Sequence, residues 1–481
     1  MFEKANLTML TDFYEITMAN GYFEADMAEH IGYFDMFFRK IPDEGGFAIM
    51  AGVEQLMEYM EGLAFTEEDL SFLQEKMNFD RRFLEYLRTF EFSCDVWSVP
   101  EGTPIFPGEP IITVRGPVIQ AQFIETMVLL TINHQSLIAT KANRIVRAAK
   151  GRSVMEFGTR RAHGASAAVY GARAAYIGGC VGTACTVAER DFGIKAMGTM
   201  AHSWVQMFPC ELDAFRKYAE IYPDNCVLLV DTYDVLKSGV PTAIQVFLEL
   251  KPKNMGIRID SGDVTYLTKH ARSMLDEAGL SDCKIVVSNS LDEYIIKEVI
   301  SEGACIDSFG VGERLITAKS EPVFGGVYKL AALEIDGVMI PKMKLSENIE
   351  KITNPGFKSL YRFYDKTTHR CMADLITLDD ELIPSGNEYI IFDEIAPWKT
   401  KVLKNFTVEN LRVQLFEKGK RVYHPPTIEE IKEHCAAQIN TLWDEMLRFD
   451  NPQIYYVDIS QNLWDMKNQL IIGIRKRSAH F

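Results

Sequence analysis

Between about residue 225 and residue 315, short apolar runs alternate with longer segments whose apolar residues recur at three-and-four spacing. The apolar runs predict buried strands, and the periodic segments predict amphipathic helices. The strands are expected within 226–234, 255–263, 284–293 and 305–315, and the helices at 240–250, 264–279 and 291–303. Strands and helices that alternate in this way form βαβ units, so this part of the chain is predicted to be a parallel sheet or barrel.

Polar residues stand at the carboxyl end of each predicted strand. In barrels and open α/β sheets, ligands bind at this end of the strands. Asp, Ser and Asn also cap helices very often, so helix capping is the alternative for any single one of them. Four consecutive strands with polar ends favour an active-site face. Its residues are Asp231 and Thr232, then Arg258, Asp260, Ser261 and Asp263, then Ser288 and Asn289, and finally Gly310, Gly312 and Glu313.

Two further segments upstream have the same character. A strand is predicted at 153–157, followed by a Gly-Thr turn, Arg160, Arg161 and an Ala-rich helix. The segment 194–204 also resembles a strand that runs into a loop, which places His202 at a strand end. This histidine lies in a run of small and apolar residues. Four interpretations are open for it: a packed core residue, a metal ligand, a proton carrier or a site of modification.

The two ends of the chain differ from its centre. The first 130 residues are rich in aromatic side chains, with a predicted strand at 33–42 and a predicted helix at 51–62. After about residue 355 the alternation stops, and turn-rich, charged sequence precedes a helix at 428–447. We therefore expect an N-terminal α+β domain at 1–135, an α/β barrel domain at 136–355 and a C-terminal domain or extension at 356–481.

Composition narrows the classes of protein and partner. Lys and Arg total 51 against 67 Asp and Glu, a net charge of −16, which argues against a nucleic-acid or anionic-membrane surface. The N-terminus carries acidic residues where a signal peptide would be apolar, and no run approaches the ~18 apolar residues of a membrane span. The nine cysteines are scattered without a CxxC motif. These features predict a cytoplasmic protein with reduced cysteines.

Positive side chains and glycine-rich turns point to anionic ligands. If the barrel closes, several cations gather on its strand-end face, where guanidinium matches phosphate and carboxylate. Surface salt bridging is the alternative, and Arg258, inside an apolar strand, fits it least. The turns at 309–314 and 323–328 can present backbone N–H groups to a phosphate. The cations are Arg160, Arg161, Arg258, Arg314 and Lys319.

Other chemistries find little support in the motifs. The chain has no GxSxG elbow, no HExxH motif and no Cys/His cluster. Asp260 and Asp263 could contact Mg²⁺ through water, as phosphate-bound magnesium often requires of a protein.

Seven motifs follow one another in a fixed order: 10-LTDFYEITM-18, 156-EFGTRRAHG-164, 198-GTMAHSW-204, 257-IRIDSGD-263, 288-SNSLDE-293, 309-FGVGERL-315 and 351-KITNPGFKSLYR-362. With this ordered set the sequence resembles the nicotinate phosphoribosyltransferases, of the type II phosphoribosyltransferase fold, over nearly its whole length. The resemblance implies an α/β fold: an irregular, incomplete α/β barrel with an N-terminal α/β domain and a C-terminal extension.

The resemblance also implies a reaction. Nicotinate and phosphoribosyl pyrophosphate would give nicotinate mononucleotide and pyrophosphate, coupled to ATP hydrolysis and assisted by Mg²⁺. His202 would be phosphorylated by ATP and act as a transient phosphohistidine. The pyridine nitrogen has a free lone pair, so positioning and electrostatic stabilisation should do most of the catalytic work.

Site residues follow from the matching motifs. Phe157 would stack on one face of the nicotinate ring, and Tyr14 of a neighbouring subunit on the other. Arg258 would pair with the carboxylate, beside Thr183. The catalytic set would be His202, Asp260 and Asp231, with Asp260 near the magnesium. Residues around the phosphates would be Arg39, Arg160, Gly310, Gly312, Gly325, Gly326, Lys351 and Lys358.

Several of these residues reach across a subunit interface in the family, so the resemblance implies a homodimer with shared active sites. Related enzymes that use nicotinamide carry an aspartate after a matching Gly-Thr, where this chain has Ala184. Removing that anion suits a carboxylate substrate, because two close negative charges repel. Two alternatives remain: a relative acting on nicotinamide or quinolinate, and a non-catalytic barrel kept as a binding or scaffold protein.

Overall fold

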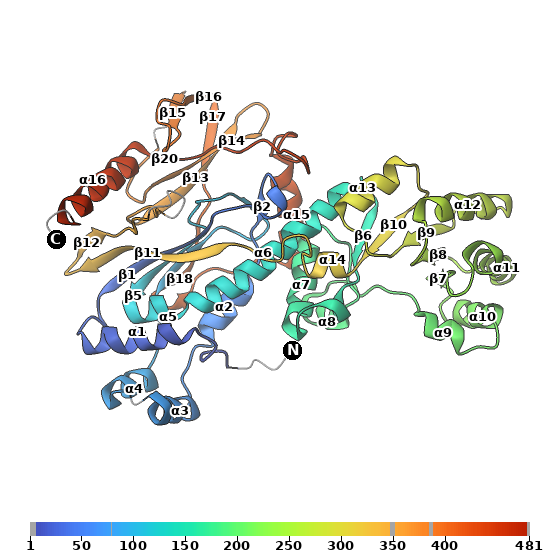
Figure 1. The fold of residues 1–481 in the computed structure, drawn as a ribbon, viewed down its shortest axis with the longest axis horizontal. Coiled ribbons are helices and arrows are strands. Elements are labelled where there is room, and N and C mark those ends of the chain that lie inside the picture. Colours follow the sequence, from blue (N-terminus) through green and yellow to red (C-terminus); the bar gives the residue numbers. More distant parts are fainter. Residues whose placement is uncertain (1–5, 78, 347–351, 384–387, 479–481) are drawn as a thin grey trace. The chain divides into compact units, whose positions relative to one another are not determined.

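The computed structural model describes residues 6–77, 79–346, 352–383 and 388–478 (Figure 1). The chain divides into two compact units. One, the continuous unit, is Leu137–Pro322. The other, the discontinuous unit, combines Met1–Ser136 with Val323–Phe481. The fold is mixed α/β, as the sequence predicts.

The continuous unit is built on a parallel sheet with strand order β6-β10-β9-β8-β7. All five strands were expected from the apolar runs, and the structure confirms them. Their interiors are buried, because helices cover parallel sheets and the strands need apolar residues on both faces. The bounds are β6 (Ser153–Glu156), β7 (Cys226–Leu229), β8 (Met255–Ile259), β9 (Lys284–Val287) and β10 (Ser308–Val311).

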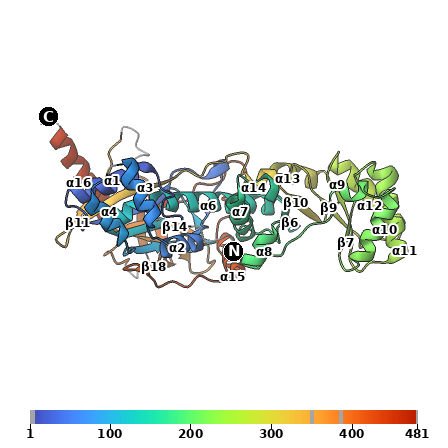
Figure 2. The same ribbon diagram turned by 90° about the horizontal axis from the view of Figure 1, so that it is seen from below.

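Helices connect and cover these strands (Figure 2). The three helices predicted between the strands are confirmed, as is the Ala-rich helix α7. The core of this unit gathers Phe215, Phe247, Ile257 and Ile285, all 0–1% exposed. The helices are α7 (Ala165–Ile177), α8 (Thr186–Phe192), α9 (His202–Gln206), α10 (Glu211–Ile221), α11 (Val240–Leu250), α12 (Val264–Glu277), α13 (Glu293–Ser301) and α14 (Glu313–Ile316).

Beyond β6 the sheet continues only as two isolated parallel bridges, Glu156 to Thr183 and Thr183 to Ala196. The strand expected at 194–204 is therefore wrong, apart from its single bridge residue. Met197 donates to the Thr183 carbonyl at 2.7 Å, and Gly198 then follows. His202 is consequently the first residue of the short helix α9 and not the end of a strand.

The discontinuous unit contains an antiparallel sheet that joins distant parts of the chain. Its strand order is β12-β11-β1-β5-β3-β18-β19, so β1 pairs with a strand some 300 positions later in the sequence, Ile31 lying opposite Glu334. The predicted strand at 33–42 corresponds to β1, and the predicted helix at 51–62 to α2. The bounds are β1 (Ile31–Phe38), β3 (Asp95–Ser98), β5 (Ile112–Pro117), β11 (Gly326–Ile335), β12 (Val338–Pro341), β18 (Val413–Glu417), β19 (Lys420–Arg421) and α2 (Val53–Glu61).

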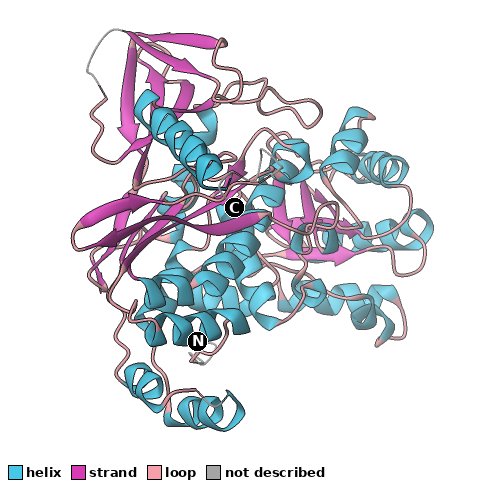
Figure 3. Cartoon of the chain, turned by 60° about the vertical axis from the view of Figure 1, so that its left-hand side comes forward, coloured by secondary structure: helices cyan, strands magenta, loops and turns pink. Residues whose placement is uncertain are grey.

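A second sheet, β17-β13-β14-β20, occupies the part of the sequence that its composition suggested was turn-rich (labelled in Figure 1; all strands are magenta in Figure 3). Its centre holds the fully buried ion pair between Arg362 Nη2 and Asp374 Oδ2, 2.6 Å apart. Tyr455 donates to the same carboxylate at 2.9 Å. The bounds are β13 (Lys358–Asp365), β14 (Cys371–Leu378), β17 (Phe406–Asn410), β20 (Val457–Ile459), α15 (Ile428–Asn440) and α16 (Gln461–Ser478).

The remaining elements include one long helix, α6, together with shorter helices and strands. None of the helices in the described ranges is long and apolar enough to cross a membrane. The elements are α1 (Phe13–Glu24), α3 (Glu67–Met77), α4 (Arg81–Arg88), α5 (Val118–Phe123), α6 (Glu125–Ala148), β2 (Ala48–Ile49), β4 (Pro104–Ile105), β15 (Glu388–Phe392) and β16 (Thr400–Lys404).

Candidate functional site

Some of the acidic residues that follow the strands of the continuous unit cap helices, and others do not. Asp263 accepts a hydrogen bond from the Tyr266 amide and caps α12, and Asp292 caps α13 in the same way. Asp231 and Asp260 do not cap helices. Asp231 Oδ2 accepts from the Asp260 amide at 3.0 Å and from the Ser261 hydroxyl at 2.6 Å. The capping interpretation therefore holds for Asp263 and fails for the two carboxylates assigned to catalysis.

Arg258 lies at the centre of the polar contacts at these strand ends. Its Nη2 donates to Asp260 Oδ1 at 3.0 Å, and its Nε donates to the Ser288 hydroxyl at 2.5 Å. Its Nη1 donates to the Thr199 hydroxyl at 3.1 Å. The guanidinium is thus fixed by three different segments. Its side chain keeps 14% exposure, which leaves it accessible to a small ligand.

Phe157 lies beside this guanidinium, with Arg258 Cζ 5.6 Å from the ring centroid. The Phe157 amide donates to the Val311 carbonyl at 2.8 Å, which anchors the residue between β6 and β10. The ring also requires Gly310, because a Cβ at that position would lie 2.4 Å from ring atoms. The site thus brings together a planar aromatic face and a cation.

Thr183 lies at the outer edge of the same face. Its hydroxyl donates to Glu156 Oε2 at 2.6 Å. Glu156 is fully buried, and burial raises the pKa of its carboxyl group. The other oxygen of Glu156 accepts from the Gly158 amide, so one carboxyl group supports both the Gly-Thr turn and the residue that follows Phe157. Ala184, the next residue, is exposed.

His202 is close to the same face and partly exposed. Its Nδ1 lies 3.2 Å from the Thr232 hydroxyl, in the segment that follows β7. Thr232 is the neighbour of Asp231, and Thr199, three residues before the histidine, holds Arg258. The imidazole therefore contacts one polar strand end directly, through Thr232, while its segment contacts a second through Thr199, and it is not a packed core residue.

The carboxylates of Asp231 and Asp260 offer oxygen ligands of the kind that magnesium prefers. Asp231 Oδ1 is buried and accepts no hydrogen bond from the described residues. Within the same ranges, no three His, Cys, Asp or Glu side chains are grouped to hold a metal ion. One or two carboxylates are the usual protein share of a magnesium site completed by substrate phosphates. The residues therefore fit Mg²⁺ that arrives with a phosphorylated substrate.

The other cations of this unit have different partners. Arg314 pairs with Asp292, and Lys319 Nζ lies 2.9 Å from Glu313 Oε1. The salt-bridge alternative thus holds for both. Arg160 is exposed, in the short turn that follows Phe157. Gly312 stands just before α14, where a Cβ would lie 3.1 Å from the Phe157 carbonyl oxygen.

A cavity of about 370 Å³ opens at the carboxyl ends of β8 and β9. Residues 262–265 after β8 and 289–291 after β9 form part of its wall, together with side chains of α13 and Arg314. Asp260 and Ser288 are not part of its wall, although the wall residues Gly262 and Asn289 follow them closely in the sequence.

The remaining predicted site residues belong to the discontinuous unit. Tyr14, in α1, is 43% exposed, and burial of the rest of the side chain together with Glu125 raises its pKa. Arg39 and Lys358 line one cavity of about 270 Å³. Lys358 is almost fully buried: its Nζ lies 2.7 Å from Asp35 and donates to two backbone carbonyls. In this conformation it holds its own segment in place.

The predicted glycine turn of this unit precedes and begins β11. A Cβ at Gly326 would lie 2.1 Å from Asn133 Oδ1, so close packing explains this glycine. A Cβ at Gly325 would have no atom within 4 Å, so packing does not explain this second glycine. Lys351 lies outside the described residues.

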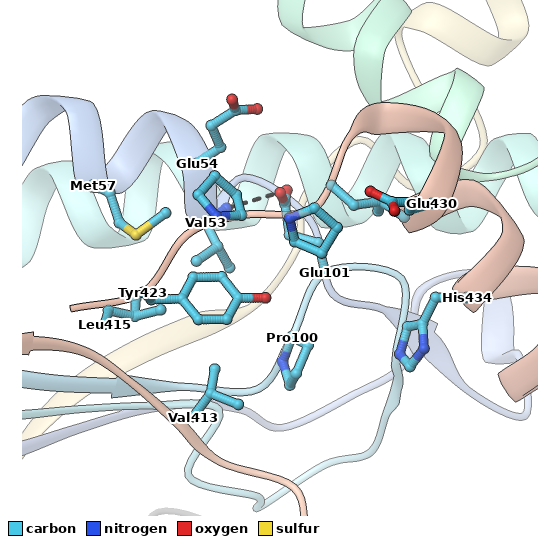
Figure 4. Close-up of a pocket in the computed structure, with 13 residues that line it drawn as sticks. Val53, Glu54, Met57, Pro100, Glu101, Val413, Leu415, Tyr423, Glu430 and His434 are labelled. Carbon is cyan, nitrogen blue, oxygen red and sulfur yellow. Dashed lines mark hydrogen bonds between the residues drawn. The ribbon is translucent and has the colours of Figure 1, made fainter. Parts of the chain in front are cut away.

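A further cavity of the discontinuous unit contains none of the predicted site residues (Figure 4). Three of its polar side chains have structural partners. Glu101 accepts from the Gly52 and Val53 amides at 2.6 and 3.2 Å and so caps α2. Glu430 completes the capping box of α15, and His434 Nε2 lies 3.0 Å from the Thr103 hydroxyl. We assign this cavity to packing between these elements.

Sequence reasoning left Glu156 and Thr199, which support the site, without an assignment, and it placed Thr232 and Ser288 at strand ends without a specific role. Each lies beside a predicted site residue within a quoted motif or at a strand end. Proximity in sequence was therefore the available signal. Their individual contacts could not be inferred, because each contact joins segments about 30 to 60 positions apart.

Comparison with known proteins covers most of the chain. The model of the nicotinate phosphoribosyltransferase N-terminal domain matches residues 9–133. The nicotinate phosphoribosyltransferase family model matches residues 152–362, and the C-terminal domain model matches residues 357–467. The sequence is 43% identical to nicotinate phosphoribosyltransferase of Bacillus subtilis (strain 168), over 99% of this chain and 97% of the relative. It is 29% identical to the Homo sapiens enzyme, over 97% of both chains.

Solved structures agree with these sequence matches. The crystal structure of human nicotinic acid phosphoribosyltransferase superposes with a TM-score of 0.86 at 28% identity, over 96% of this chain and 99% of that one. Nicotinate-nucleotide pyrophosphorylase from Pyrococcus furiosus shares the fold, with a TM-score of 0.70 at 23% identity over 92% and 97% of the two chains.

Proposed function

Because the chain belongs to the nicotinate phosphoribosyltransferase family, we propose that it transfers a phosphoribosyl group to nicotinate in NAD biosynthesis and couples this transfer to ATP hydrolysis through His202. The substrates are nicotinate and phosphoribosyl pyrophosphate. The pyridine nitrogen forms a bond to C1 of the ribose while the bond from C1 to pyrophosphate breaks. Nicotinate mononucleotide and pyrophosphate are the products.

One observation carries the assignment of the nicotinate site: Arg258 lies 5.6 Å from the ring centroid of Phe157. An aromatic carboxylate needs a flat apolar surface for its ring and a cation for its charge. The two side chains supply both. Ala184 adds no negative charge beside Thr183, which favours nicotinate over nicotinamide.

The carboxylates of Asp231 and Asp260 belong to the part of the site that would bind phosphoribosyl pyrophosphate. Asp231 and Asp260 would hold Mg²⁺ together with the pyrophosphate, and the ion would neutralise charge on the leaving group. Asp260 also stays close to the ribose as positive charge develops there. Arg160, Gly310 and Gly312 would face the phosphates. No base is required, because the pyridine nitrogen carries no proton to remove; catalysis depends on orientation and on fixed charges.

His202 provides the coupling. An imidazole nitrogen attacks the γ-phosphorus of ATP, a P–N bond forms and ADP leaves. Water later cleaves that bond and releases phosphate. Thr199 and Thr232 support this step, because they connect the histidine segment with Arg258 and with the residue next to Asp231. A change at the imidazole can therefore reach both substrate groups.

The same proposal includes the assembly. Tyr14, Arg39, Gly325, Gly326, Lys351 and Lys358 would complete the active site of a neighbouring copy in a homodimer. The five-stranded sheet and its two added bridges would form the wall of an incomplete barrel within the domain at 136–355, between domains at 1–135 and 356–481. All nine cysteines are free thiols, in keeping with a reducing cytoplasm.

The first prediction concerns His202→Ala. We expect this variant to keep weak transfer activity and to lose its response to ATP, because the phosphorylated nitrogen is gone. Pyrophosphate release is measured with nicotinate, phosphoribosyl pyrophosphate and Mg²⁺, with and without ATP. Labelling with γ-³²P ATP follows the phosphohistidine directly.

His270→Ala is the matched control, since this histidine lies on the exposed side of α12 and bonds only to its own helix. It should keep full ATP stimulation. A His202→Ala enzyme that ATP still stimulates would refute the coupling role. Wild-type protein without any nicotinate-dependent pyrophosphate release would refute the transferase itself.

A further inference from the structure

Ser288 connects the two charged residues of the proposed nicotinate site. It directly follows β9 and is 4% exposed. Its hydroxyl accepts from Arg258 Nε at 2.5 Å and donates to Asp260 Oδ1 at 2.6 Å. Arg258 Nη2 donates to the same Oδ1 at 3.0 Å. The three side chains thus form a closed ring of hydrogen bonds.

The backbone fixes the position of residue 288. The Ser288 amide donates to the Ile259 carbonyl at 3.0 Å, which continues the pairing of β8 with β9. The side chain does not cap the following helix, since Asp292 does so. Ser288 therefore has its rotamer determined by Arg258 and Asp260 alone among the contacts described.

The closed ring of hydrogen bonds among Arg258, Asp260 and Ser288 determines the orientation of the guanidinium. Carboxylate and guanidinium prefer a bidentate pair, in which the two oxygens of Asp260 would accept from Nε and Nη2 on one edge of Arg258. The Ser288 hydroxyl occupies Nε and shares Oδ1, so Asp260 takes a single donor from Arg258. Among the described contacts one hydrogen of Nη2 has no acceptor, and Nη1 makes two longer bonds, to the Thr199 hydroxyl at 3.1 Å and to the Met200 carbonyl at 3.4 Å, so this end of the guanidinium can still donate to a second carboxylate.

We propose that Ser288 is a positioning residue for recognition of the substrate's carboxylate. It prevents Arg258 from collapsing onto Asp260 and holds the guanidinium toward the ring-binding side, beside Phe157. This inference rests on the proposed function, because it takes Arg258 as the residue that binds nicotinate. Ser288 itself touches no substrate.

The test is the kinetics of Ser288→Ala. Without the hydroxyl, Arg258 Nε loses its partner and the guanidinium turns toward Asp260. We expect the KM for nicotinate to rise about tenfold, the order expected for one lost hydrogen bond to a charged group. The KM for phosphoribosyl pyrophosphate and the thermal midpoint should stay close to wild type.

Two further variants separate positioning from packing. Ser288→Thr keeps the hydroxyl and should restore the KM for nicotinate to within about threefold of wild type. Ser288→Cys keeps the size but has a weak donor and acceptor, and should resemble Ser288→Ala. If Ser288→Ala does not fold, the Cys and Thr pair still decides the question.

Ser290→Ala is the matched control, because it is the same chemical change at an exposed position of the same turn. It should leave both KM values unchanged. An unchanged KM for nicotinate in Ser288→Ala and Ser288→Cys would overturn the inference. So would a parallel rise of both KM values with a lowered thermal midpoint, which is the signature of a structural role.

Failure of this inference differs from failure of the proposed function. If the wild-type protein makes no nicotinate mononucleotide, the proposed function is wrong. If the wild-type protein is active and Ser288→Ala behaves normally, only the role of Ser288 is wrong.

Discussion

At the residue scale, Gly310 and Phe157 depend on each other. Gly310 has an ordinary strand backbone, so conformational freedom does not explain this glycine. Lack of space explains it, because a Cβ at this position would lie 2.4 and 2.5 Å from two atoms of the Phe157 ring. The glycine therefore defines where the ring can lie. This packing role exists independently of the contact with phosphate that the sequence suggested.

Gly310→Ala should move the Phe157 ring away from Arg258. We expect a loss of about 1–3 kcal/mol in the free energy of unfolding, as is usual when extra atoms enter a packed site. The KM for nicotinate should rise at the same time, because the stacking surface moves. Urea denaturation and steady-state kinetics measure the two effects.

Gly473→Ala is the comparison variant, since Gly473 lies in α16 with open space around its Cβ position. It should be neutral or slightly stabilising, because alanine favours helices. A Gly310→Ala protein as stable and as active as Gly473→Ala would show that the ring has room to adapt.

At the scale of elements, α1 is held by a buried carboxyl group. Glu15 is 0% exposed; Thr11 and Thr126 donate to it, the Thr126 hydroxyl at 2.6 Å. Burial outweighs these bonds and raises the pKa of Glu15 from 4.5 to about 7. Tyr14 precedes it on the same helix. The attachment of this helix is therefore expected to respond to pH near neutrality.

The direction of the change in stability with pH follows from proton binding. The folded protein holds the Glu15 proton more tightly than the unfolded chain, so this contribution to the free energy of unfolding decreases as pH rises from about 4.5 to about 7. Above that range it stays constant. We expect wild type to lose about 1–3 kcal/mol relative to Glu15→Gln between pH 5 and pH 8.

Urea denaturation of both proteins at the two pH values gives this difference. Glu15→Gln serves as the control because its side chain stays neutral while the titration of every other group is retained. An equal gap between the two proteins at pH 5 and pH 8 would contradict the raised pKa.

How far the sequence predicts the elements depends on the distance between partners. The βαβ units of the continuous unit are visible as local periodicity, because each strand and its following helix are neighbours in the chain. The order β6-β10-β9-β8-β7 and the partners of Arg258 depend on distant pairings and were not predictable in this way. The segment 194–204 misled because its apolar residues resemble a strand, whereas only Ala196 finds a pairing partner.

At the scale of the whole molecule, the proposed homodimer makes a direct prediction. If Tyr14 of one copy completes the site of the other, Tyr14→Ala and Arg258→Ala damage the same site from different subunits. A mixed dimer then has one site with both defects and one with none. Mixing the two inactive proteins through unfolding and refolding should recover up to about a quarter of wild-type activity, since half of the dimers are mixed.

Refolding each variant alone gives the baseline for that experiment. Activity of the mixture no greater than the sum of the two baselines would contradict a shared active site. Size-exclusion chromatography of each variant establishes that the subunits still associate.

The pairing of β1 with β11 also has a consequence for how the protein is made. A ribosome delivers about 5–20 residues per second, so β1 waits roughly 15–60 seconds before its partner strand emerges. The strands of the continuous unit all emerge between residues 153 and 311, before that partner. During translation the antiparallel sheet of the discontinuous unit therefore stays incomplete, while the continuous unit can already fold. The nascent chain carries an open strand edge for that interval, and this edge is where chaperones would be needed most.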